Sequence, residues 1–143
     1  MKFKMLLILG AVISLLSGCV SKQLVPMPDQ TKAIEDSSKA RIYVVRPTSI
    51  GGAVPFTVWD GDKKVGSTRP SGYICWERPP GDTVIRSEAE NTATLQLKCE
   101  SGKVYYIGQH VTIGWLYSRN QLRLMADDEG KKKVAACSPS RVQ

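Results

Sequence analysis

Histidine is almost absent from this chain, and cysteine is sparse. His110 is the single histidine among 143 residues, and no two of the four cysteines have Cys-x-x-Cys spacing. Structural and catalytic zinc sites are built mainly from clustered cysteine and histidine side chains. The sequence therefore predicts no metal site, and nothing in it indicates a cofactor.

The shortage of histidine also limits hydrolytic chemistry. A serine or cysteine nucleophile needs a base within hydrogen-bond reach, and His110 is expected at the surface or rim of a strand. Carboxylates occur in pairs, Asp60 with Asp62 and Glu88 with Glu90. They fall in turns or at alternate strand positions, so we interpret them as solvated and not as a general acid and base. We predict that the protein is not an enzyme and has no catalytic residue.

A strong excess of one charge is lacking as well. The net charge of +7 falls to +5 when Lys2 and Lys4 of the first segment are removed, and the one dense basic run is Lys131 to Lys133. Binding to nucleic acid requires many lysine and arginine contacts with phosphates. We expect a solvated surface and no nucleic-acid partner, and we keep anionic lipid headgroups as an alternative partner.

The longest apolar run stands at the N-terminus. It extends from Met5 to Leu16 and follows the basic residues Lys2 and Lys4. A run of about a dozen residues is shorter than the roughly 20 that a membrane-spanning helix needs. A basic lead-in before a short apolar core is typical of an export signal. Residues 1–18 are therefore predicted to be a signal peptide.

The apolar run ends in Leu16-Ser17-Gly18-Cys19, which closely resembles the lipobox of bacterial lipoproteins. The resemblance implies signal cleavage between Gly18 and Cys19 and attachment of acyl chains such as palmitate to Cys19. Val20, not aspartate, follows the cysteine. By its similarity to enterobacterial lipoproteins, this implies the outer membrane, with the domain facing the periplasm. The alternative is an ordinary cleaved signal with a cysteine beside it by chance.

Three cysteines remain if Cys19 carries lipid, and an exported protein can form disulfides. Cys99 continues an alternation of apolar residues and is expected on a buried face, where cysteine behaves as a small apolar residue. Cys137 lies near a polar C-terminal tail that a bridge would fasten to the domain. We expect a disulfide between Cys75 and Cys137, with Cys99 as the alternative partner of Cys75.

Residues 19–39 are predicted to be a lipidated tether, because they contain Pro26 and Pro28 and no sustained apolar pattern. At about 3.3–3.6 Å per residue, such a segment could hold a domain up to roughly 60–70 Å from the bilayer. The remaining residues, 40–143, have the size of one domain with its own core.

Short segments rich in β-branched, aromatic and alternating residues fill that domain. They cover residues 41–46, 56–60, 64–68, 72–77, 84–89, 92–99, 104–111 and 121–125. Turn residues separate them, including Asp60-Gly61 and Pro79-Pro80-Gly81. Because no helical pattern lies between these strands, we predict a mainly β fold, a small antiparallel β-sandwich of about seven to eight strands. Residues 128–136 are predicted to form a short C-terminal helix, which Gly130 weakens.

Four short motifs follow one another along the domain. They are Ala40-Arg-Ile-Tyr-Val-Val-Arg-Pro47, Val58-Trp-Asp-Gly61, Pro79-Pro-Gly81 and Gly102-Lys-Val-Tyr-Tyr106. This series resembles a family of small bacterial lipoproteins known as domain of unknown function 2846. The Asp-Gly hairpin followed by the Pro-Gly turn is also similar to PEGA-type β-sandwich modules. Neither resemblance supplies a catalytic residue.

Tyrosine and tryptophan are frequent relative to the two phenylalanines, with five and three residues respectively. Such side chains either close the ends of a sandwich or act as rigid anchors for a partner. Trp115 and Tyr117 form our candidate interaction surface. We expect an outer-membrane lipoprotein that acts as a tethered periplasmic interaction or envelope-structural module for an envelope protein or glycan. The alternatives are a small glycan- or peptidoglycan-binding module and, third, an envelope hydrolase with His110 in a cleft.

Overall fold

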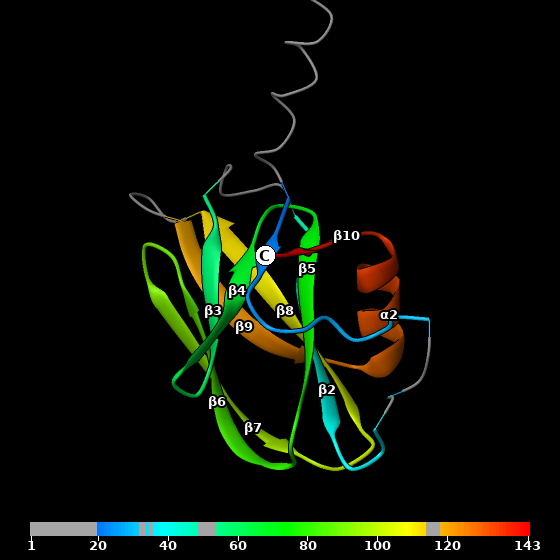
Figure 1. The fold of residues 1–143 in the computed structure, drawn as a ribbon. Coiled ribbons are helices and arrows are strands. Elements are labelled where there is room, and N and C mark those ends of the chain that lie inside the picture. Colours follow the sequence, from blue (N-terminus) through cyan, green and yellow to red (C-terminus); the bar gives the residue numbers. More distant parts are fainter. Residues whose placement is uncertain (1–19, 32–33, 35, 49–53, 114–117) are drawn as a thin grey trace, which may run out of the picture.

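A computed structural model describes residues 20–31, 34, 36–48, 54–113 and 118–143 of the chain. Two β-sheets pack face to face, and one helix near the C-terminus covers the outer side of one sheet (Figure 1). This architecture confirms the predicted mainly β sandwich with a short C-terminal helix.

The described residues form eleven strands and one helix. The strands are β1 (Lys22–Gln23), β2 (Ala40–Arg46), β3 (Phe56–Asp60), β4 (Lys63–Thr68), β5 (Gly72–Arg78), β6 (Gly81–Glu88), β7 (Thr92–Cys99), β8 (Val104–Ile113), β9 (Ser118–Met125), β10 (Ser138–Pro139) and β11 (Arg141–Val142), and the helix is α2 (Asp127–Ala135). The eight longer strands, β2 to β9, correspond to the eight segments expected from the sequence.

The first sheet has the strand order β11-β1-β4-β3-β6-β7, and the second has the order β10-β5-β2-β8-β9. Neighbouring hairpins pair antiparallel, as expected, but both sheets are mixed. In the second sheet β2 and β8 run parallel, with Ile42 opposite Tyr105 and Val44 opposite Ile107. The chain between β2 and β8 passes through the first sheet before it returns, and such a long crossover is what parallel neighbours require.

The main core lies between the two sheets, and a second apolar cluster lies under α2. The first cluster includes Ile42, Val44, Val58, Ile74, Trp76, Ile85, Leu97, Cys99 and Ile107. The second includes Tyr43, Val45, Tyr73, Cys75, Tyr106 and Met125, with Val134 and Cys137 packed against it. Every residue of β2 is buried, because β2 has one cluster on each face. This double burial explains why β2 is nearly continuously apolar in sequence.

Helix α2 packs on the outer face of the second sheet at Gly130. A Cβ atom at Gly130 would lie 2.1 Å from Cγ of Tyr106, so only glycine allows this close approach. The Tyr106 ring in turn stacks on Tyr43, with centroids 5.1 Å apart. Acidic residues occupy the first turn of the helix and lysines the last, which complements the helix dipole. Gly130 is therefore a packing requirement of this helix.

Residues 21–25, at the start of the expected tether, are built into the sandwich. Strand β1 pairs antiparallel with β4 and parallel with β11, with Lys22 opposite both Ser67 and Arg141. The inward-facing residues Ser21, Gln23 and Val25 are only 2%, 0% and 5% exposed. Two of these three residues are polar, so the sequence shows no alternation of apolar and polar residues that would predict a strand here. Within the described ranges, no helix is long and apolar enough to cross a membrane.

Candidate functional site

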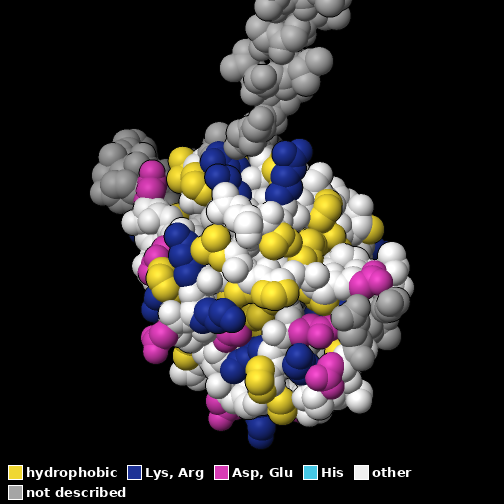
Figure 2. Space-filling model, in the orientation of Figure 1, with side chains coloured by type: hydrophobic (Ala, Val, Ile, Leu, Met, Phe, Trp, Pro, Cys, Tyr) yellow, Lys and Arg dark blue, Asp and Glu magenta, His cyan; other side chains and the backbone are white. Residues whose placement is uncertain are grey.

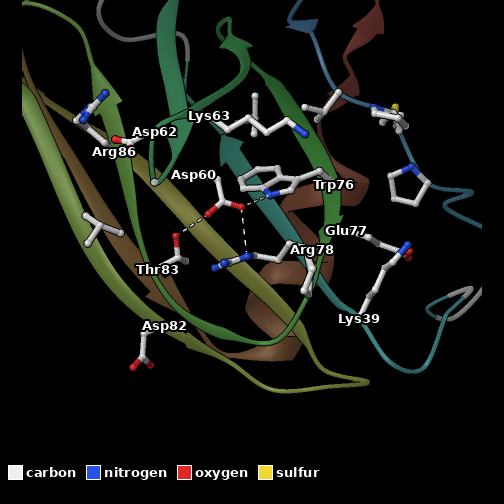
Figure 3. A pocket seen from close by; sticks show the side chains of 18 residues that line it. Lys39, Asp60, Asp62, Lys63, Trp76, Glu77, Arg78, Asp82, Thr83 and Arg86 are labelled. Carbon is white, nitrogen blue, oxygen red and sulfur yellow. Dashed lines mark hydrogen bonds and ion pairs between the residues drawn. The ribbon is translucent and has the colours of Figure 1, made fainter.

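A groove of about 890 Å³ opens at the edge of the sandwich, near the point where β5 leaves one sheet and the chain continues as β6 in the other. Figure 3 shows its lining, with Trp76 near the centre. The β3–β4 turn forms one wall, the segment from Trp76 to Pro79 forms another, and residues 25–28 and several residues of β6 also line the groove. We call this site the edge groove.

Asp60 is the residue that joins the walls of the edge groove. It ends β3 beside Gly61, whose φ of +58° allows the tight turn into β4. Asp60 Oδ2 accepts a hydrogen bond from Trp76 Nε1 at 2.9 Å and lies 3.4 Å from Arg78 Nε. Asp60 Oδ1 accepts a hydrogen bond from Thr83 Oγ1 at 2.6 Å. The carboxylate thereby connects β3, β5 and β6, and this arrangement explains why the Asp-Gly pair stands here.

Charged side chains of both signs surround an apolar interior in the edge groove. The acidic lining residues are Asp60, Asp62, Glu77 and Asp82, and the basic ones are Lys39, Lys63, Arg78 and Arg86. Apolar lining comes from Val25, Val65 and Trp76. A concave site with apolar walls and a few convergent polar groups is suited to binding. Its mixed charges fit a ligand that carries hydrogen-bonding and charged groups along its length.

One of these acidic residues is committed to an ion pair. Glu77 Oε1 lies 2.8 Å from Arg41 Nη2, and the two side chains are 12% and 3% exposed. Burial alone would lower the pKa of Arg41, but hydrogen bonds to Glu77 and Tyr43 raise it overall. The pair holds β2 against β5 behind the groove. Among the described residues, no group of three or more His, Cys, Asp or Glu side chains could hold a metal ion.

Gln23 links β1 to β5 beside the edge groove through side-chain hydrogen bonds, and no pattern in the sequence predicts this role. Its side chain is fully buried. Nε2 donates to the carbonyl oxygens of Cys75 at 2.6 Å and Val25 at 3.1 Å. Oε1 accepts from the backbone N–H of Cys75 at 3.1 Å and from Ser140 Oγ at 2.6 Å. One side chain thus satisfies both backbone groups of Cys75, as a neighbouring strand would.

The structure places His110 away from the edge groove, on β8 beside helix α2. Arg123 Nε donates to His110 Nε2 at 3.4 Å, and Arg123 also pairs with Glu129 at 2.5 Å. Burial lowers the pKa of His110, and the positive charge of Arg123 lowers it further. His110 Nε2 thus accepts a hydrogen bond in a surface network with Arg123 and Glu129.

The cysteines do not form the bridges expected from the sequence. Cys75, Cys99 and Cys137 are all free thiols in the structure. Cys99 belongs to the cluster between the sheets, whereas Cys75 lies on the opposite face of the second sheet. Cys137 lies between α2 and β10 and packs against the same cluster under α2 that contains Cys75, yet the two thiols are not bonded to each other.

Four residues that the sequence predicts to be functional lie outside the described residues. They are Gly18 and Cys19 at the predicted cleavage and lipidation site, and Trp115 and Tyr117 of the candidate interaction surface. The described aromatic residues take part mainly in packing. Tyr43, Tyr73, Trp76 and Tyr106 are buried. The Tyr105 hydroxyl donates to the Lys98 carbonyl at 3.0 Å. Trp59 is half-buried, with the Arg86 guanidinium 4.8 Å from its ring centroid.

Comparison with known proteins gives two findings. A family model described as "Protein of unknown function (DUF2846)" matches residues 36–118. The chain is also similar to an "Uncharacterized protein" of Haemophilus influenzae, at 26% identity over 133 residues, which covers 90% of this chain and 79% of that protein. The matched family region includes Asp60, Trp76 and Arg78, and it begins after Gln23.

Proposed function

The chain belongs to the DUF2846 family of proteins of unknown function, and from that premise we propose that it is a lipid-anchored module of the bacterial outer membrane that binds an envelope partner at its edge groove. The proposed anchor is Cys19, and the proposed location of the domain is the periplasmic side. No catalytic step is assigned to it.

The observation that carries this proposal is the position of β1 directly after the lipobox. Ser21 Oγ accepts a hydrogen bond from the Arg69 N–H at 2.8 Å, and the Ser21 carbonyl accepts one from the Arg141 N–H at 2.9 Å. Two residues of chain span at most about 7 Å. An acyl group on Cys19 would therefore hold the domain directly at the membrane and not on a long tether.

Such confinement favours a binding role. A domain held in a thin layer has a high effective concentration toward a partner in the same membrane, so weak contacts suffice. A multiply acylated cysteine meets the requirement for stable anchoring. The edge groove supplies a concave surface with charged rim residues, and Lys63 and Asp82 on its rim are exposed. We infer that an envelope protein segment is its ligand.

A second candidate is a small module that binds peptidoglycan or another glycan. The specific observation in its favour is the mixture of an apolar interior with carboxylates and amines in a groove of about 890 Å³. Glycans that carry peptide stems present both kinds of group. In this case the same groove would bind a soluble fragment without any protein partner.

In-cell photo-crosslinking separates the two candidates. The acylated chain carries a photoreactive residue in place of Lys63, and a matched control carries it in place of Lys131 on the exposed side of α2. A recurrent protein adduct at position 63 that is missing at position 131 supports the envelope-protein role. Adducts that contain only glycan support the second candidate. Equal adducts at both positions would reject the edge groove as the binding site.

A further inference from the structure

The corner of the molecule where β1 begins is basic and contains no acidic residue. Three segments meet there, residues 20–25, 66–73 and 138–143, through the pairing of β1 with β4 and β11 and of β10 with β5. Together they contain Lys22, Arg69 and Arg141 and no aspartate or glutamate. We call this surface the basic corner. Figure 2 shows Lys and Arg side chains gathered at this upper end of the molecule.

The backbone keeps these three cations together. Lys22 and Arg141 are register partners on adjacent strands, and both side chains are exposed. Adjacent strands lie about 4.8 Å apart, so the two positive charges are neighbours. The Arg69 backbone is fixed to the same strand through its hydrogen bond to Ser21 Oγ. Positive charge is therefore concentrated at the place where the chain enters the domain.

A buried arginine adds to the positive potential behind the basic corner. Arg46 is fully buried, its guanidinium lies 3.8 Å from the Phe56 ring centroid, and its Nη1 donates to the Val54 carbonyl at 2.6 Å. Burial lowers the pKa of Arg46, and the nearby charge of Arg69 lowers it further. Arg46 therefore adds a positive charge close to that of Arg69.

The edge groove has a different electrostatic character. Four acidic residues line it, and no acidic residue belongs to the basic corner. The three segments of the basic corner therefore contribute only positive side chains, whereas the lining of the edge groove contains charges of both signs. An anionic bilayer would attract the first and have little preference for the second.

We propose that the basic corner rests on an anionic phospholipid bilayer, with Lys22, Arg69 and Arg141 facing the headgroup phosphates. This inference rests on the proposed lipidation of Cys19 for its orientation, because Ser21 lies within about 7 Å of that residue along the chain. At that separation the cations lie within about one Debye length of the headgroups, so salt does not screen them fully. The contact fixes how the domain stands on the membrane and which surfaces stay open to a partner.

Amine labelling of the acylated protein tests this orientation. The intact mass is measured first, since a missing acyl group would refute the proposed function independently of the basic corner. The protein is then placed in nanodiscs of phosphatidylcholine alone or with one quarter phosphatidylglycerol, and an amine-reactive reagent labels exposed lysines. We expect phosphatidylglycerol to slow labelling of Lys22 and to leave Lys98, exposed on β7, unchanged. Equal labelling of Lys22 in the two lipids would overturn the proposal.

Vesicle binding of the unacylated chain tests the charge contribution alone. The chain from residue 19 with Cys19→Ser is sedimented with vesicles containing phosphatidylglycerol. Each Lys or Arg near an anionic surface strengthens binding by about 5-fold, so Lys22→Gln with Arg141→Gln should weaken it roughly 20- to 30-fold. The control pair Lys98→Gln with Lys131→Gln should change it by less than about 2-fold.

Two further results would count against the proposal. An equal loss of binding in both double variants would show that only net charge matters, and protection of Lys22 by inorganic phosphate without lipid would indicate a free-phosphate site. Circular dichroism melts of each variant confirm that binding is compared between folded proteins.

Discussion

Gln23 is the residue whose replacement best tests whether the segment after the predicted lipobox belongs to the domain. In Gln23→Ala, four groups lose a hydrogen-bond partner in a buried site: the Cys75 N–H, the carbonyls of Cys75 and Val25, and the Ser140 hydroxyl. Each buried polar group left without a partner costs about 1–3 kcal/mol. Allowing for partial entry of water into the space left behind, we expect the free energy of unfolding to fall by about 3–5 kcal/mol.

A second variant separates hydrogen bonding from packing. Gln23→Leu keeps most of the side-chain volume but has no polar atom, so it removes the same four hydrogen bonds. It should be destabilised nearly as much as Gln23→Ala. The neighbouring Lys22→Ala removes an exposed side chain and should change stability by less than about 0.5 kcal/mol.

Urea unfolding of the chain from residue 19, followed by tryptophan fluorescence, measures these differences. For a domain of this size the expected loss corresponds to a decrease in Tm of roughly 10–20 °C. If Gln23→Ala and Lys22→Ala have equal stability, residues 21–23 do not clamp the sandwich in solution. The segment would then be a tether, and the proposal that the acyl group lies close to the domain would be wrong.

The other predictions concern packing, ion pairing and thiol chemistry. Replacing glycine by alanine inside a helix usually stabilises it by about 1 kcal/mol. Gly130→Ala should instead lower Tm, because the added Cβ atom would collide with Tyr106. An increased Tm would refute this close packing. Asp60→Asn keeps the shape of the side chain but removes the negative charge that faces Arg78. We expect the free energy of unfolding, measured in urea, to fall by about 1–3 kcal/mol. Unchanged stability would exclude Asp60 as the link between the groove walls. Burial raises the pKa of Cys75 from 9.0 to about 11, so its thiolate fraction at pH 8 should be roughly 100-fold below that of an ordinary thiol. Stability should fall as the pH rises from about 9 towards 11, where only the unfolded chain ionises Cys75. Peptide mapping without reductant should recover Cys137 as a free thiol, and a Cys75–Cys137 peptide would contradict the free thiols of the structure.

Most of the strands could be predicted from the sequence, because the pattern of apolar and polar side chains along a strand reflects which face is buried. Strands β3 to β9 alternate or end in turn dipeptides such as Asp60-Gly61, and these patterns depend on neighbours within a few residues. Gly130 shows the limit of this local reasoning. It weakened the helix prediction on propensity alone, whereas in the structure its missing Cβ permits contact with Tyr106. Propensity could not reveal this, because Tyr106 lies in a different element.

The candidate site was much harder to predict. Asp60 was recognised as a turn residue, but its partners Trp76, Arg78 and Thr83 come from two other strands. The interaction surface expected at Trp115 and Tyr117 falls outside the described residues. The disulfide prediction relied on compartment and spacing. Those considerations contain no information on how folding distributes the thiols, with Cys99 in the cluster between the sheets and Cys75 and Cys137 at the cluster under α2.

By itself, the sequence determined the export signal pattern, the family resemblance, the mainly β composition and the order of the long strands. All of these are local properties, since a lipobox, a turn or an alternating strand is complete within a few consecutive residues. Only the tertiary structure decided that residues 21–25 close the sandwich, that the edge groove forms around Asp60, and that Lys22, Arg69 and Arg141 share one corner. These features join residues from distant segments, and their hydrogen bonds and charges act through space once the sheets have packed.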